Sequence, residues 1–143
     1  MEKREWSAGE LLAKAERYCA SAERCSSQVC DKLVQWGADE KDVPAIIEYL
    51  YADKYLDDSR FAHAYVHDKL LYQGWGRKKI GFMLSGLGIN PVTQQEALAS
   101  IDEQDYMRVL NKVSASKRSA TREQRIRFLM QRGFLYEEII HVL

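Results

Sequence analysis

Net charge is the first thing this 143-residue chain lacks, because 21 lysines and arginines balance 21 aspartates and glutamates. A protein dedicated to DNA binding usually carries a strong positive field, so this balance argues against strong independent binding to DNA. Proline is also scarce, with two residues, which disfavours a loop-rich or strand-rich design. The composition therefore predicts an ordered and mostly helical protein.

Cysteines and long apolar runs are scarce as well. Cys19, Cys25 and Cys30 are odd in number and lack the Cys-x-x-Cys spacing of a zinc or redox site, so we expect small apolar residues in a reducing compartment. No segment approaches the ~20 apolar residues that span a bilayer, and the first residues show no signal-peptide pattern. These absences predict a cytoplasmic protein with no membrane partner.

Sequence patterns that predict helices and their ends recur three times along the chain. Apolar residues follow helical spacing from Leu11, and N-cap candidates come later at Ser26 or Ser27, Asp42, Asp57 or Asp58, Asn90, and Thr121 with its capping-box partner Gln124. Gly37, Gly88 and Gly133 each follow a leucine four residues earlier: Leu33, Leu84 and Leu129. Glycine at these positions is typical of a helix that ends at a residue with the left-handed backbone conformation.

We therefore predict an all-α fold of tandem three-helix, helix-turn-helix-like repeats that form an elongated, curved array. The predicted boundaries are an N-terminal extension at 1–9 and repeats at 10–55, 56–101 and 102–143. A single irregular helical domain is the alternative, because leucine-rich helices that end in glycine are common.

Catalytic and metal chemistry find little support in the sequence. Asp57 and Asp58 are adjacent, so their carboxylates point in different directions, and a helix-capping role explains both. His63 and His67 have the spacing of a zinc-binding pair but no evident third ligand. Gly74-x-Gly76 follows a helix, unlike a phosphate loop. We expect no catalytic, cofactor or metal site.

Two groups of basic residues are the candidates for partner binding. Arg77, Lys78 and Lys79 open a helix, where the dipole disfavours cations, so an anionic partner would explain them. A longer basic stripe runs towards the C-terminal end and predicts contact with phosphate or an acidic protein surface. Its members are Lys117, Arg118, Arg122, Arg125, Arg127 and Arg132.

A motif between Tyr55 and Ile89 carries a family resemblance. It contains Leu56, Asp57, Asp58, Arg60, Phe61, Ala62, Ala64, Tyr65, Val66, Asp68 and Lys69, then Gly74-Trp75-Gly76-Arg77-x-Lys79-Ile80, Leu84 and Gly88-Ile89. Part of this motif recurs, with a looser match, at Arg132-Gly133-Phe134 and Ile139. The chain resembles the RecX regulatory family of bacterial proteins, which modulate the RecA recombinase. The first repeat resembles the family least, and His63 and His67 stand where this family often has basic residues.

The resemblance implies a non-enzymatic, all-helical monomer that binds RecA filaments on single-stranded DNA and restrains their assembly and activity in recombination, DNA repair and the SOS response. It implies a curved array that lies in the filament groove and blocks partners or subunit stacking. Weak contact with single- or double-stranded DNA is a further expectation.

A helix-turn-helix-like DNA-binding regulator is the alternative function. In that hypothesis the helix from Arg77 to Leu87, or the helix from Arg122 to Arg132, would read a DNA groove. A passive helical adaptor is a third hypothesis. An enzyme is the class that the residues support least.

Overall fold

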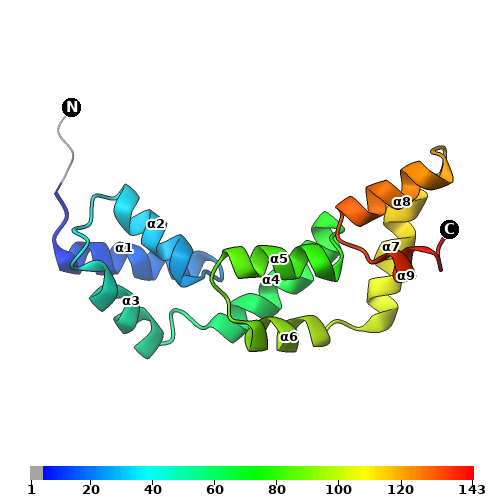
Figure 1. Ribbon diagram of the computed structural model, residues 1–143. Helices are drawn as coiled ribbons and strands as arrows, with labels where there is room; N and C mark the ends of the chain where they lie inside the picture. The colour runs from blue at the N-terminus through cyan, green and yellow to red at the C-terminus, as the bar shows by residue number, and fades with distance from the viewer. Residues whose placement is uncertain (1–4) are drawn as a thin grey trace. The chain divides into compact units, whose positions relative to one another are not determined.

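A computed structural model describes residues 5–143, and this part of the chain contains nine α-helices and no β-strand (Figure 1). The helices are α1 (Ala8–Ser21), α2 (Ser26–Gln35), α3 (Val43–Ala52), α4 (Asp58–Gln73), α5 (Arg77–Gly86), α6 (Pro91–Ala99), α7 (Glu103–Ala115), α8 (Arg122–Gln131) and α9 (Tyr136–Ile139). The all-α prediction is confirmed. None of the helices between residues 5 and 143 combines the length and the apolar composition that a membrane span requires.

The chain divides into two compact units, Met1–Phe61 and Ala62–Leu143. The core of the first unit is formed by α1, α2, α3 and the segment that follows them, with Leu11, Val29, Leu33, Leu50 and Leu56 almost wholly buried. Residues 1–4 of the expected extension at 1–9 lie outside the described part of the chain, and α1 begins at Ala8. The boundaries of the three repeats stay a prediction.

The second unit contains a buried aromatic pair. Tyr106 of α7 and Phe134, which follows α8, are both buried, and their ring centroids lie 5.6 Å apart. Other buried side chains of this unit are aliphatic: Val66, Leu70, Ile80, Leu84, Leu110, Leu129 and Ile139. Aromatic pairs at this separation attract one another beyond the area that they bury. The pair therefore ties α7 to the end of α8.

The predicted N-cap residues occupy the expected positions at the helix starts, with one exception. The side chains of Asn90 and Thr121 accept the amides of Thr93 and Gln124, and the Asp57 carboxylate accepts the amide of Arg60. Asp42 occupies the N-cap position of α3, although its side chain makes no capping hydrogen bond. The exception is α2.

The Ser26 or Ser27 cap predicted for α2 is wrong. Ser26 is the first helical residue, and the N-cap position is Cys25, whose amide donates to the side-chain oxygen of Gln28 at 3.1 Å. A glutamine at this third position of the helix reaches back to satisfy an amide that the helix itself cannot pair. The serine pattern alone did not distinguish these neighbouring positions.

Three helix ends are closed in the same way. Gly37, Gly88 and Gly133 have φ values of +85°, +85° and +96°. The amide after each glycine donates to the carbonyl of the leucine four residues before the glycine, at 2.9, 3.1 and 3.1 Å for Leu33, Leu84 and Leu129 respectively. Each of these leucines is fully buried. This is the Schellman motif, in which a left-handed residue lets the chain turn back and pair its last carbonyls.

The residues of the family motif are mostly structural. Leu56, Phe61, Ala62 and Ile80 are buried, whereas Tyr65 and Trp75 are half-buried. Asp58 accepts a hydrogen bond of 2.7 Å from the Tyr51 hydroxyl. The pKa of Tyr51 is raised to about 12. Burial of the phenol is the main cause, and its hydrogen bond to Asp58 is the second.

Candidate partner-binding surface

The Gly74-Trp75-Gly76 turn lies directly against the Arg132-Gly133-Phe134 turn. The Gly76 amide donates to the Arg132 carbonyl at 2.8 Å, and the Lys78 amide donates to the Gly133 carbonyl at 3.2 Å. A Cβ at Gly76 would overlap the backbone of Gly133, and a Cβ at Gly133 would overlap Lys79. Both glycines are therefore required by close backbone contact. We call this contact the glycine joint.

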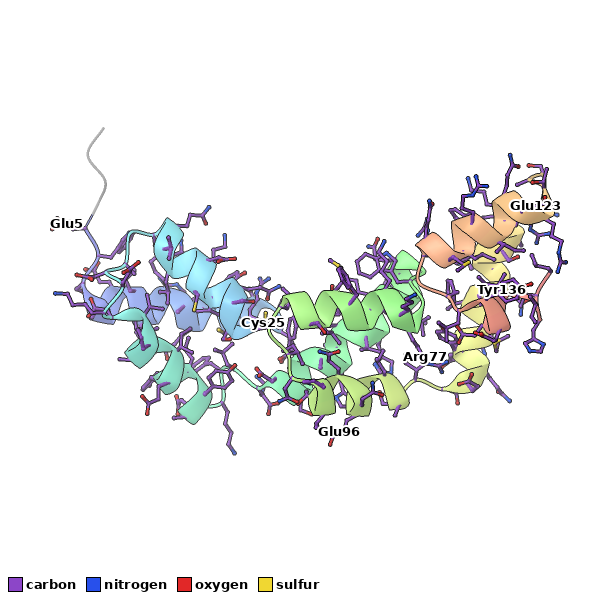
Figure 2. The ribbon with its side chains drawn as sticks, viewed as in Figure 1. Glu5, Cys25, Arg77, Glu96, Glu123 and Tyr136 are labelled. Carbon is purple, nitrogen blue, oxygen red and sulfur yellow. The ribbon has the colours of Figure 1, made fainter. Side chains whose placement is uncertain are left out.

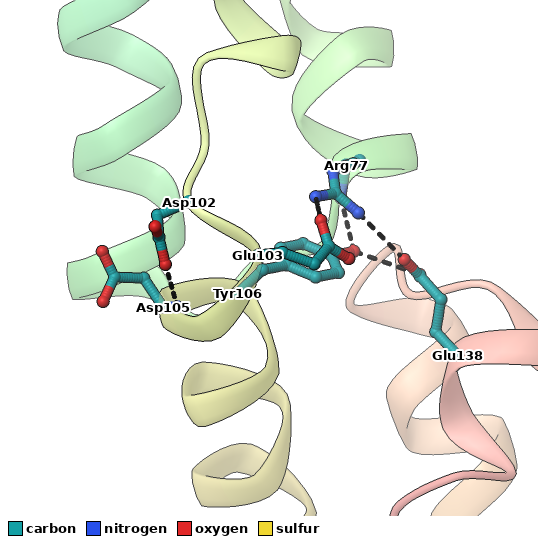
Figure 3. A network of polar contacts seen from close by, with 6 residues as sticks. All are labelled: Arg77, Asp102, Glu103, Asp105, Tyr106 and Glu138. Atoms are coloured by element: carbon teal, nitrogen blue, oxygen red, sulfur yellow. Dashed lines mark hydrogen bonds and ion pairs between the residues drawn. The ribbon is translucent and has the colours of Figure 1, made fainter.

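Arg77 lies beside the glycine joint, where α5 begins and faces α7 (Figure 2). Its guanidinium stacks 3.8 Å from the centroid of the Tyr106 ring and pairs with Glu103 at 2.6 Å and Glu138 at 3.3 Å (Figure 3). The Tyr106 hydroxyl donates to Glu138 and accepts the Arg77 amide, both at 3.1 Å. Three segments thus meet through one network.

Burial dominates the chemistry of this network. Tyr106 is 0% exposed, and burial, reinforced by the nearby Glu138 carboxylate, raises the pKa of its phenol well above the usual value of 10. A neutral phenol can donate to Glu138, whereas a phenolate would face that carboxylate in a region with little water. The network therefore keeps Tyr106 protonated, and its hydroxyl donates a hydrogen bond to Glu138.

These contacts change the interpretation of several predicted partner-binding residues. The Arg77 charge at the start of α5 is compensated by Glu103 and Glu138, so no external anion is needed to explain it. Arg125 donates to the Ser114 hydroxyl at 2.8 Å, and Arg132 donates to the Gln73 carbonyl at 2.7 Å. Lys79 packs its stem on Gly133 and places its ammonium 4.5 Å from the Trp75 ring centroid.

The other predicted residues remain exposed. Lys78 lies on α5 and lines an open groove of about 610 Å³ with Phe82. Four other basic residues are exposed on the α7–α8 connection and on α8: Lys117, Arg118, Arg122 and Arg127. We call these four basic residues the α8 basic set, and they are the part of the predicted stripe that a partner can reach. Exposed Glu123 interrupts the set (Figure 2).

A second groove escaped the sequence analysis. It has a volume of about 460 Å³ and lies between the end of α4 and one face of α7, with Leu71, Tyr72, Arg108, Lys112 and Arg132 among its lining residues. Tyr72 is 79% exposed and Leu71 is 52% exposed. The sequence signal was the spacing of Arg108 and Lys112, which are four residues apart and therefore share a helix face.

The histidine pair shows no metal-binding arrangement. His67 donates from Nδ1 to the carbonyl of His63 at 2.8 Å, which turns its ring along its own helix. Across residues 5–143, no group of three histidine, cysteine, aspartate or glutamate side chains is placed to hold a metal ion.

Cys19 and Cys25 are buried free thiols, and burial raises the pKa of Cys19.

The fold and these surfaces define a class of protein: an all-helical chain of small helical modules with exposed basic surfaces. Residues 57–98 match the family model described as RecX, second three-helix domain. Regulatory protein RecX of Herbaspirillum seropedicae is 30% identical over 134 residues, covering 90% of this chain and 86% of that protein. The chain belongs to the RecX family.

Other relatives agree with this assignment. Regulatory protein RecX of Clostridium tetani is 30% identical over 139 residues, which cover 90% of this chain and 63% of that protein. The chain thus spans somewhat less than two thirds of the length of that clostridial relative. A crystal structure of RecX from Lactobacillus salivarius has the same fold, with a TM-score of 0.77, 20% identity and coverage of 94% of this chain and 93% of that one.

Proposed function

We propose that this protein binds RecA recombinase filaments and restrains their assembly and activity. Membership of the RecX family is the observation that carries the proposal, since the relatives are described as regulatory proteins. Action on RecA places the protein in the cytoplasm. We propose that it acts as a monomer whose successive modules contact successive subunits of the filament, so that many weak contacts act together.

The α8 basic set is the surface that we assign to this contact. Arg122 is the first residue of α8, where the helix dipole disfavours a cation. Lys117 and Arg118 lie in the connection just before it. Unlike Arg77, these three residues are exposed in a region of excess positive charge, although the Lys117 ammonium lies 4.9 Å from the Phe128 ring centroid. An acidic surface on RecA, or the DNA backbone beside it, would offset their repulsion.

A titration of the protein into RecA on single-stranded DNA tests the proposal, with filament ATP hydrolysis as the readout. We expect inhibition at substoichiometric protein. The double variant Arg122→Glu and Arg127→Glu should raise the concentration for half-inhibition about tenfold or more, because reversed charges repel an acidic partner.

The matched control is Arg17→Glu with Lys41→Glu, which reverses two exposed charges in the first unit. The control should inhibit like the parent protein. No effect of the parent protein on RecA would overturn the proposed function, whereas normal inhibition by the α8 variant would overturn only the surface assignment.

The alternative of a DNA-reading helix finds less support. Arg77 would be a leading base-contacting residue of α5, but it is held by Tyr106, Glu103 and Glu138. Affinity for bare duplex DNA that falls steeply with salt, together with no effect on RecA, would favour this alternative.

A further inference from the structure

The groove between α5 and α6 is kept open by a glycine that the fold does not require. Gly81 lies inside α5, where glycine is less stable than alanine. Outside its own helix backbone, a Cβ at Gly81 would meet Leu98 Cδ1 at 3.6 Å and Gln94 Oε1 at 3.9 Å, which are ordinary contacts. At Gly76 and Gly133, by contrast, a Cβ would overlap backbone atoms. The missing side chain at Gly81 therefore serves the groove of about 610 Å³ that this residue lines.

An unpaired hydrogen-bond acceptor lies beside the space that Gly81 leaves. Gln94 of α6 is 9% exposed, and its Nε2 donates to the Ile89 carbonyl at 2.7 Å and to the Ser85 hydroxyl at 2.9 Å. The bond to a carbonyl fixes the orientation of this amide, because only the nitrogen can donate. Gln94 Oε1 accepts no hydrogen bond from the described residues. A ligand that displaces water from this oxygen must therefore bring a donor of its own.

Apolar side chains line the rest of this groove. Phe82 is 76% exposed and Leu135 is 44% exposed, and Leu98 lies beside the space over Gly81. A flat apolar ring that covers these side chains removes their surface from water. The indole of tryptophan combines such a ring with a single N–H group, which donates a hydrogen bond and accepts none. Its chemistry matches a groove whose buried amide offers only an acceptor.

Lys78 decides which groups can lie beside the indole. Arg77 and Glu103 also line the groove, but they pair with each other at 2.6 Å. Lys78 is exposed and forms no ion pair with the described residues. It would repel an arginine or lysine occupant, whereas it would attract a carboxylate next to the indole. A nucleic-acid strand needs a row of cations, and this groove offers one unpaired cation.

We propose that the groove between α5 and α6 binds a protein segment through a tryptophan side chain that lies over Gly81. The indole N–H donates to Gln94 Oε1, and an acidic residue adjacent to the tryptophan pairs with Lys78. Tryptophan is among the residues that most often dominate the binding energy of protein interfaces. The site is separate from the α8 basic set, and the proposal holds whether or not that set contacts RecA.

A titration of the whole isotope-labelled protein with the capped peptide acetyl-Ala-Glu-Trp-Ala-amide tests the proposal. The readout is the NMR shift of the Gly81 backbone amide and of the Gln94 side-chain amide, and we expect both to change saturably. A peptide methylated on the indole nitrogen, or one with phenylalanine in place of tryptophan, should bind about tenfold more weakly, because Gln94 Oε1 loses its donor. A tyrosine peptide should also bind more weakly, since its ring covers less apolar surface.

Two protein variants locate the site. Gly81→Leu should weaken binding about tenfold or more, because the new side chain occupies the space of the indole. Gly86→Leu is the matched control: Gly86 also belongs to α5, does not line the groove and has no neighbouring atom within 4 Å of a Cβ. Lys78→Glu should weaken binding of the Glu-Trp peptide and strengthen binding of a Lys-Trp peptide.

Circular dichroism checks that each variant is folded, and the peptide series on the parent protein needs no variant at all. Equal affinity for the tryptophan, N-methylated and phenylalanine peptides would overturn the proposal, as would equal affinity of the Gly81→Leu and Gly86→Leu variants. Absence of saturable shifts at millimolar peptide would also overturn it. RecA and nucleic acid are absent from this assay, so its result is independent of the inhibition experiment above.

Discussion

Replacing Gly133 by alanine should destabilise the second unit much more than the same change at Gly88. Both glycines end a helix in the left-handed region, with φ values of +96° and +85°, and both precede an amide that closes a Schellman motif. An alanine at either position therefore carries a backbone strain of about 1–2 kcal/mol. The backbone conformation alone therefore predicts similar losses of unfolding free energy for Gly133→Ala and Gly88→Ala.

The surroundings of the two glycines differ. Among the described residues other than its chain neighbours, none has a heavy atom within 4 Å of a Cβ built at Gly88, whereas a Cβ at Gly133 would lie 2.6 Å from the Lys79 amide nitrogen and closer still to its side chain. Relieving this overlap must move the glycine joint and strain its hydrogen bonds. Overpacking of this kind adds about 1–3 kcal/mol, so we expect a total loss of about 2–5 kcal/mol for Gly133→Ala.

Urea-induced unfolding followed by circular dichroism measures these losses, and hydrogen exchange of α5 and α8 amides assigns them to the second unit. Exchange is needed because two compact units need not unfold together. Gly88→Ala is the matched control. Equal destabilisation by the two substitutions, within about 0.5 kcal/mol, would refute the inference that the joint depends on close backbone contact at Gly133.

The buried polar network gives two further predictions. Tyr106→Phe removes the donor to Glu138 and the acceptor of the Arg77 amide, and should lower the free energy of unfolding by about 1–3 kcal/mol in the same urea assay while the ring stays packed. The pKa values of Tyr51, at about 12, and of Tyr106 are raised by folding, so the unfolded chain loses these protons first. The stability that these two phenols contribute should be constant below pH 10 and should fall as the pH rises above 10, and ultraviolet titration should show that they ionise well above pH 10 in the folded state. A fully reversible titration of all tyrosines near pH 10 in the folded state would contradict the second prediction.

Local features were readable from the sequence because they depend on neighbouring residues. The caps at Asp57, Asn90 and Thr121 rest on hydrogen bonds that span three residues. The left-handed turns at Gly37, Gly88 and Gly133 follow from the backbone freedom of glycine at the end of an apolar helix. The family motif was readable for the same reason, since most of it builds and joins helices.

The function of each charge was decided by the tertiary structure. Arg77, Arg125 and Arg122 look alike in the sequence, yet Arg77 is held by two carboxylates and Arg125 by Ser114, whereas Arg122 is exposed. Likewise, the Tyr72 ring and the Lys112 ammonium belong to one groove only because α4 and α7 meet in the second unit. Helix ends and glycine turns are set by local hydrogen bonds and sterics. Whether a charged side chain is paired or exposed depends on residues distant in the sequence, as the pairing of Arg77 depends on Glu138, which lies 61 positions away.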